Sequence, residues 1–153
     1  MSSSRHSVVI DSFSGEFAFL SNFYRSRVAL DGVTYPTVEH AYQAAKTHDE
    51  ALRAQIRIAA TPGEAKRLGR KVPLRPDWEG VKVDVMHDLL VQKFADPFLG
   101  NMLRATNGAT LIESNTWNDR TWGMVAGEGK NLLGKLLEEV RIQLCTATDD
   151  EDG

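Results

Sequence analysis

Cysteine is almost absent from this 153-residue sequence, and long apolar runs are missing altogether. The single cysteine, Cys145, cannot form an internal disulfide, which favours a reducing, cytoplasmic setting. Since no run of about 18 apolar residues occurs, we expect no membrane-spanning helix and no membrane partner. The opening residues, MSSSRHS, also lack the apolar core of a secretory signal.

Metal-binding patterns are missing too. The four histidines are isolated from one another, no H-E-x-x-H pattern occurs, and one cysteine cannot make a thiolate cluster. Cys145 lies on an apolar C-terminal stretch, where a catalytic nucleophile is not expected. We therefore expect chemistry that uses no metal and no other cofactor.

Charge is unevenly distributed along the chain, which carries a formal net charge of −3. Between Arg53 and Lys82 there are eight basic residues and three acidic ones. This stretch is either a solvated helical surface or a site for a phosphorylated ligand or nucleic acid. Residues 149–152 are all acidic, so we predict a disordered tail over 146–153. Residues 1–7 are predicted to be flexible.

The N-terminal part favours β structure. Residues 8–10 are β-branched, and the apolar runs 28–30 and 33–35 flank Asp31-Gly32, the pair typical of a type I′ hairpin. Pro36 is expected to stop the second strand, and Thr37 to cap the following helix. These signals predict a small antiparallel sheet near the N-terminus.

The rest of the pattern is mostly helical. Residues 61–64, TPGE, combine a capping box with proline at the first helical position, and Gly69 can end that helix. Asp77 can cap a longer helix to about residue 95, and Asp96-Pro97 starts another that stops at 107–108. A last strand is expected at 111–112, before apolar helical spacing over 132–144. We predict an α+β fold with one mostly helical domain over residues 8–145.

The segment 37–46, TVEHAYQAAK, carries polar residues in register. Glu39, Gln43 and Lys46 recur at i, i+4 and i+7, at the margin of the apolar arc of this helix. They are either a solvated stripe or the wall of a pocket. In a pocket, partial burial would lower the pKa of Lys46 and leave a nucleophilic amine, whereas the Glu39 carboxylate would oppose that shift.

Three further segments mix aromatic, polar and glycine residues. Residues 20–24, LSNFY, are either a strand end with an Asx turn or a site that stacks a base. Residues 111–123 hold two tryptophans with Glu113 and Asp119, which are either turn residues or paired carboxylates beside a sugar carbon. The glycines of 123–131 form either a flexible turn or an anion-binding loop, because no standard phosphate motif is complete.

Four blocks, taken in order, resemble the NADAR (YbiA-like) N-glycosidase family. They are FLSNFY at 19–24, TVEHAYQAAK at 37–46, AKRLGR with DWEGVKVDVM at 65–70 and 77–86, and NDRTWG with GKNLLGKLLEEVR at 118–123 and 129–141. The resemblance spans roughly residues 8–145.

This resemblance implies an enzyme that hydrolyses a ribose–nitrogen bond. The implied substrate is either a ribosylamino-pyrimidine phosphate, an early riboflavin intermediate, or a guanine base in nucleic acid that carries ADP-ribose. A non-catalytic module that binds ADP-ribose or NAD is the alternative, and a plain nucleic-acid-binding domain is a third reading. We expect a monomer.

The resemblance also assigns roles to residues. Lys46 becomes the candidate nucleophile through a Schiff base, Glu39 a proton shuttle, and Asp119 and Glu113 the carboxylates of the acidic loop. The implied substrate-binding residues are Asn22, Phe23, Arg70, Trp78, Lys82, Trp122, Gly123 and Asn131. Trp117 and Met124 depart from the family pattern, which leaves the shape of this loop and the choice of substrate open.

Overall fold

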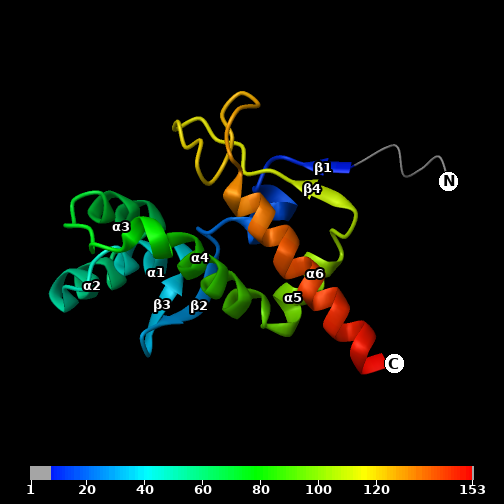
Figure 1. Cartoon of the computed structure of the whole chain (residues 1–153), viewed down its shortest axis with the longest axis horizontal. Helices are drawn as coiled ribbons and strands as arrows, with labels where there is room; N and C mark the ends of the chain where they lie inside the picture. The colour runs from blue at the N-terminus through cyan, green and yellow to red at the C-terminus, as the bar shows by residue number, and fades with distance from the viewer. Residues whose placement is uncertain (1–7, 153) are drawn as a thin grey trace. The chain divides into compact units, whose positions relative to one another are not determined.

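Residues 8–152 are described by a computed structural model (Figure 1). The chain divides into two units. The central unit is Asn22–Lys93, and the terminal unit combines Met1–Ser21 with Phe94–Gly153. Helices and short strands are mixed in the described chain, which confirms the predicted α+β class. The prediction of a flexible segment at 1–7 falls outside the described residues.

The central unit begins with the predicted hairpin. β2 (Arg25–Leu30) pairs antiparallel with β3 (Val33–Thr37), with Leu30 opposite Val33. Asp31 and Gly32 both have positive φ angles, 50° and 82°, as a type I′ turn requires. The expectation that Pro36 stops the strand is wrong by one residue, because β3 runs on to Thr37. Proline is tolerated there since the sheet has two strands and every strand is an edge.

Three short helices follow the hairpin and pack together (Figure 1). α1 (Val38–Ala45) starts where the Thr37 hydroxyl accepts from the His40 amide at 3.0 Å, which confirms the predicted cap. α2 (Glu50–Arg57) and α3 (Pro62–Gly69) both contact α1. In α3 the Thr61 hydroxyl accepts from the Glu64 amide at 3.1 Å, again as predicted. All eight residues of α1 are buried as a result.

The last helix of the central unit, α4 (Trp78–Phe94), supplies much of its apolar core. It begins directly after Asp77, whose carboxylate pairs with the Arg75 guanidinium at 2.6 Å. Its buried side chains belong to one apolar core with those of the hairpin, α1 and α2. The apolar surface that this core buries stabilises the unit. These core residues are Val28, Tyr35, Val38, Ile56, Trp78, Met86, Leu89 and Leu90.

The terminal unit pairs two distant strands. β1 (Val8–Ile10) lies parallel to β4 (Ala109–Leu111), with Val9 opposite Thr110. The predicted strand at 8–10 is therefore real, but it belongs to this parallel pair and not to the antiparallel hairpin. Parallel strands need a long connection, so their partners are not neighbours in sequence. The 3₁₀ helix η2 (Gly15–Leu20) follows β1.

Two helices complete the terminal unit. α5 (Pro97–Arg104) starts at Asp96, whose Oδ1 accepts from the Phe98 and Leu99 amides, as the sequence predicts. α6 (Leu132–Asp152) packs on α5 and β4. It extends through residues 146–152, for which the sequence predicts a disordered tail, because an established helix adds turns readily beyond its packed part. In the described chain, no helix is long and apolar enough to cross a membrane.

Candidate active site

The polar stripe of α1 is not a solvated surface. Glu39 and Gln43 are only 8% and 4% exposed, and Lys46, at the C-terminal end of the helix, is half-buried. The Gln43 side-chain amide donates to Glu39 Oε2 at 2.6 Å, so the first two members are joined by a hydrogen bond. The stripe is therefore largely buried beneath neighbouring elements, which is incompatible with a solvated stripe, and its interpretation as a pocket wall stays a prediction.

Close packing of α3 explains the burial of Gln43. A Cβ placed on Gly69 would lie 2.0 Å from Gln43 Oε1 and 2.8 Å from Gln43 Cβ, so only glycine fits there. The sequence predicts that Gly69 can end α3, and Gly69 is indeed the last residue of that helix. It lies in the last turn of α3 without a positive φ angle, and its small size is what the packing requires.

Aromatic rings support Lys46. Its Nζ lies 5.8 Å from the centroid of the Tyr42 ring, within cation–π distance, and Tyr42 packs on Trp78 with ring centroids 5.2 Å apart. The backbone of Lys46 is held as well, since its carbonyl accepts from the Arg75 amide at 2.7 Å. The lysine therefore projects from a fixed backbone over a packed aromatic pair.

Burial lowers the pKa of Lys46 below its ordinary value. The nearby Glu39 carboxylate opposes this by favouring the ammonium form, whereas the positive charges of Arg70, Lys66 and Lys82 lower the pKa further. The competition between burial and Glu39 is the one that the sequence suggested, and burial prevails. A lysine in this setting has a larger neutral fraction at neutral pH than an exposed one.

Asn22 joins this region through α1. Its carbonyl accepts from the Glu39 amide at 3.1 Å, and its side-chain nitrogen contacts Met86 Sδ at 3.5 Å. Among the described residues, Asn22 Oδ1 is buried with no hydrogen-bond partner, which leaves one acceptor available. The neighbouring Phe23 is 45% exposed.

The basic residues of the central unit also gather near Lys46. Arg70 and Lys82 are close enough to act on its pKa, and Lys82 pairs with Glu79 at 2.7 Å. Trp78 is 4% exposed and contacts the Tyr42 ring that lies under Lys46. Two of these predicted binding residues therefore act on the charge of Lys46, and the third packs on the ring beneath it.

In the terminal unit, Asp119 organises a tight loop. Its Oδ1 accepts from the backbone amides of Thr121 and Trp122, at 3.0 and 2.9 Å. Asn115 fixes the same turn, because it accepts from the Asp119 amide and donates to the Asp119 carbonyl. The turn interpretation of Asp119 and Arg120 describes these contacts, and the catalytic role of Asp119 stays a prediction.

Glu113 and Gly123 are packed directly against each other. A Cβ on Gly123 would lie 1.8 Å from Glu113 Oε2 and 2.1 Å from the Glu113 carbonyl oxygen. The same carboxylate oxygen accepts from the Asn115 side chain at 3.0 Å. Trp122, one residue before this glycine, is half-buried, whereas Trp117 is 53% exposed.

Asn131 connects this loop to β4 and α6. Its side chain accepts from the Glu113 amide at 3.0 Å and donates to the Leu111 carbonyl at 2.9 Å. The left-handed φ of 50° at Asn131 is common for asparagine. Both polar atoms of this side chain therefore hold the backbone, and its predicted contact with substrate stays a prediction.

The predicted site residues thus fall into two sets. Lys46 and Glu39 lie in the central unit with Asn22, Phe23, Arg70, Trp78 and Lys82. Asp119 and Glu113 lie in the terminal unit with Trp122, Gly123 and Asn131. Each set is gathered within its own unit.

Three residues make structural hydrogen bonds that the sequence analysis did not predict. His40 is 2% exposed and bonds the Thr37 hydroxyl at 2.7 Å and the Ala59 carbonyl at 3.1 Å. Arg75 and Asn115 hold the backbones of Lys46 and Asp119. Nothing in local spacing identifies such contacts, although a histidine on a buried helical face is a weak signal. In the described part of the chain, no His, Cys, Asp and Glu side chains gather in a group that could hold a metal ion.

Comparison with known proteins places these observations in context. A family model described as the NADAR domain matches residues 11–145. The chain is 44% identical over 138 residues to N-glycosidase YbiA of Escherichia coli (strain K12), covering 88% of this chain and 86% of that protein. An NMR structure of E. coli YbiA superposes with a TM-score of 0.81 at 42% identity, covering 93% of this chain and 88% of the other.

A longer relative carries a different description. Riboflavin biosynthesis protein PYRR, chloroplastic, of Zea mays is 37% identical over 147 residues, which cover 84% of this chain and 23% of that protein. The expectation of an N-glycosidase family agrees with the names that these relatives carry.

Proposed function

Because the chain belongs to the NADAR domain family, we propose that it is an N-glycosidase that hydrolyses the ribose–nitrogen bond of a ribosylated amine. The observation that carries the proposal is Lys46, a half-buried lysine of lowered pKa above an aromatic pair. The names of the relatives support a hydrolase of N-glycosyl bonds that acts on small ribosylamines. The lysine mechanism comes from the chemistry of the residues.

The reaction begins at the sugar carbon that bears the amine. When the ribose ring opens, the C1–O4 bond breaks, the N–H proton of the glycosidic nitrogen passes to O4, and C1 becomes a neutral imine carbon bonded to the base nitrogen. The neutral Nζ of Lys46 adds to C1. Both protons of Nζ pass in turn to the base nitrogen, the bond between C1 and that nitrogen breaks, and the base leaves as a free amine. C1 is then bound to Lys46 as a Schiff base.

Water completes the cycle. Its oxygen adds to C1, both of its protons pass in turn to Nζ, and the C1–Nζ bond breaks to release the open-chain ribose aldehyde and the lysine amine. The net change is one water consumed, with one free amine and one ribose formed. Glu39 is the group that we assign to these proton transfers, because its carboxylate is near enough to Lys46 to shift the lysine's pKa.

Asn22 and the basic residues complete the assignment. Asn22 Oδ1 is a buried acceptor that can receive an N–H of the leaving base, and the exposed Phe23 ring can stack on it. Arg70 and Lys82 bring positive charge that attracts the substrate phosphate. Asp119, Glu113 and the other predicted residues of the terminal unit keep the roles given by the family resemblance, as proposals within that unit.

Trapping the intermediate tests this function directly. Wild-type protein, Lys46→Ala and the exposed-lysine control Lys71→Ala are incubated with a pyrimidine ribosylamine phosphate and, in parallel, with ADP-ribosylated guanine DNA. Borohydride reduces a Schiff base to a stable adduct that intact mass spectrometry detects. We expect base release and an adduct in wild type and Lys71→Ala, and neither in Lys46→Ala.

Other outcomes separate the alternatives. Unchanged turnover in Lys46→Ala would contradict the lysine mechanism while leaving an N-glycosidase. Tight binding of ADP-ribose with no base released from either substrate would identify a non-catalytic binding module. The substrate that is turned over decides between the two substrate classes.

A further inference from the structure

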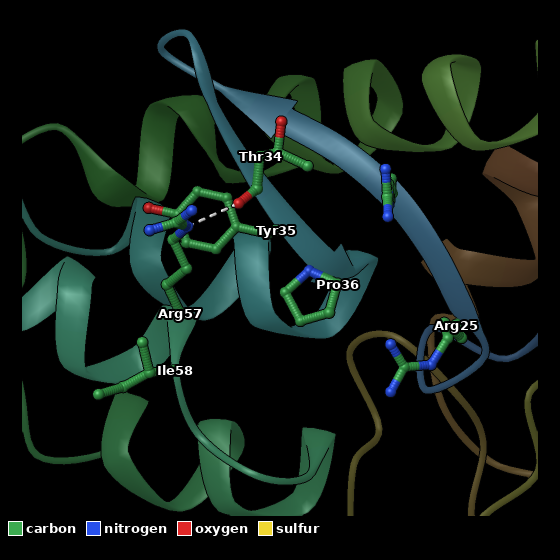
Figure 2. Close-up of a pocket in the computed structure, with 7 residues that line it drawn as sticks. Arg25, Thr34, Tyr35, Pro36, Arg57 and Ile58 are labelled. Carbon is green, nitrogen blue, oxygen red and sulfur yellow. Dashed lines mark hydrogen bonds between the residues drawn. The ribbon is translucent and has the colours of Figure 1, made fainter.

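A second candidate site lies on the β2–β3 hairpin. Figure 2 shows a pocket of about 420 Å³ in the central unit, within the size range of ligand sites. Its walls come from both strands and from the end of α2. The lining residues are Arg25, Arg27, Thr34, Tyr35, Pro36, Arg57 and Ile58.

Positive charge dominates this pocket. Arg25, Arg27 and Arg57 are all exposed, and within the described residues none of them forms an ion pair. The nearby carboxylate of Asp31 is bound to Arg53 at 2.7 Å. A pocket that holds three guanidinium groups and no lining carboxylate attracts anions and repels cations.

The arginines are spread along the hairpin. Arg57 is anchored by its Nε, which donates to the Thr34 carbonyl at 2.8 Å, so its terminal nitrogens remain available. In Figure 2, Arg57 lies beside Tyr35, whereas Arg25 lies beyond Pro36 at the start of β2. A row of charges matches a chain of phosphates better than a single compact anion does.

The remaining lining residues indicate what part of such a ligand is bound. Thr34 is exposed and offers a hydroxyl donor, whereas the Tyr35 ring is 2% exposed and cannot stack on a base. Ile58, 76% exposed, gives only a small apolar edge. We propose that this arginine pocket binds the phosphodiester backbone of a single-stranded nucleic acid, through its phosphates and without reading its bases.

One extension of this inference rests on the proposed function. Strand β3 leads directly into α1, whose eight residues span about 12 Å. The pocket and Lys46 therefore lie in one unit, joined by a single short helix. A strand whose modified base is at Lys46 could place phosphates a few nucleotides away on the arginines, which would favour the nucleic acid substrate over the small ribosylamine.

Salt-dependent binding of an unmodified single-stranded DNA 12-mer tests the pocket. Fluorescence anisotropy is measured between 50 and 200 mM salt, a range in which phosphate contacts change affinity strongly. Removing two contacts with Arg25→Gln/Arg27→Gln should lower the slope of log K against log salt by about 1.4, at ~0.7 per phosphate. Arg67→Gln/Lys135→Gln loses the same charge outside the pocket and should keep the wild-type slope.

Each result is decisive for the pocket. A wild-type slope in Arg25→Gln/Arg27→Gln would overturn the proposal, and so would binding of inorganic phosphate with no added affinity for the 12-mer. In case the double variant unfolds, amide chemical shifts of Thr34 and Ile58 in wild type must move on DNA titration. The proposed function is tested by a separate experiment. It fails if the wild-type protein releases no base from either substrate.

Discussion

Some of the candidate site residues of the two units differ in how their polar groups are used. In the terminal unit, Asp119, Asn131 and Asn115 direct their hydrogen bonds at backbone groups and hold a loop. In the central unit, Lys46 is half-buried with a lowered pKa, and Asn22 Oδ1 has no partner among the described residues. Groups with bonding capacity left over are those able to act on a ligand, which is why we assign the bond-making step to the central unit.

The two units also differ in their net charge. The central unit carries twelve Lys and Arg against nine Asp and Glu, a formal charge of +3, although the whole chain is at −3. The terminal unit therefore carries −6. The net acidity of the chain hides a basic unit that is suited to phosphate-bearing ligands.

The largest expected effect is on the loop of the terminal unit. Gly123→Ala places a methyl group 1.8 Å from Glu113 Oε2 and 2.1 Å from a backbone carbonyl, which cannot move easily. We expect a loss of ~3 kcal/mol in the free energy of unfolding, measured by urea denaturation. Gly80→Ala is the control, since nothing lies near its Cβ within α4, and it should leave stability equal or slightly higher.

The catalytic assignment of the central unit is tested by Glu39→Gln. We expect turnover to fall on the order of 10²-fold, because the proton shuttle is lost. Glu39 raises the pKa of Lys46, so its removal lowers that pKa further and moves the acid limb of the pH–rate profile to lower pH. Glu50→Gln, at an exposed carboxylate of the same unit, is the control. An acid limb that moves to higher pH would contradict the coupling of Glu39 to Lys46.

Two variants of Asp119 test whether its carboxylate has a structural or a catalytic role. Asp119→Ala leaves two backbone amides without their acceptor, and we expect a loss of about 2 kcal/mol in stability. Asp119→Asn keeps an acceptor oxygen, so its stability should stay close to wild type. If Asp119→Asn also keeps full turnover, the carboxylate acts only on the loop. A stable Asp119→Asn with lost turnover would bring the terminal unit into the chemistry.

The smallest effect is a pH dependence of stability from Lys93. Burial lowers the pKa of Lys93 to about 7 from its ordinary 10.5, and the side chain is 1% exposed. Between these values the unfolded chain holds a proton that the folded chain has lost. The free energy of unfolding should therefore rise with pH across this window, by at most ~1.4 kcal/mol per pH unit.

Lys93→Met removes this titration and should flatten the slope measured by urea unfolding at pH 7.5, 8.5 and 9.5. The exposed Lys135→Met is the control and should keep it. An undiminished slope in Lys93→Met would show that other groups cause the dependence.

Local signals predicted the starts of elements well and their partners poorly. The caps at Thr37, Thr61 and Asp96 lie where the sequence places them, because a cap depends on residues within one turn. The pairing of β1 with β4 could not be predicted. The paired residues are about a hundred positions apart, and no local sequence pattern indicates which strand pairs with which. The close packing of Gly69 could not be predicted for the same reason, because its neighbour Gln43 lies on another helix.

By itself, the sequence determined the α+β class, the register of Glu39, Gln43 and Lys46 along one helix, and the blocks that identify the family. Helical period and hairpin chemistry act over a few residues, so they can be read from the chain. Only the tertiary structure decided that the α1 stripe is buried, that Lys46 has a lowered pKa, and that three arginines share a pocket on the hairpin. Burial and electrostatic environment depend on what packs alongside, and packing joins residues that the sequence keeps apart.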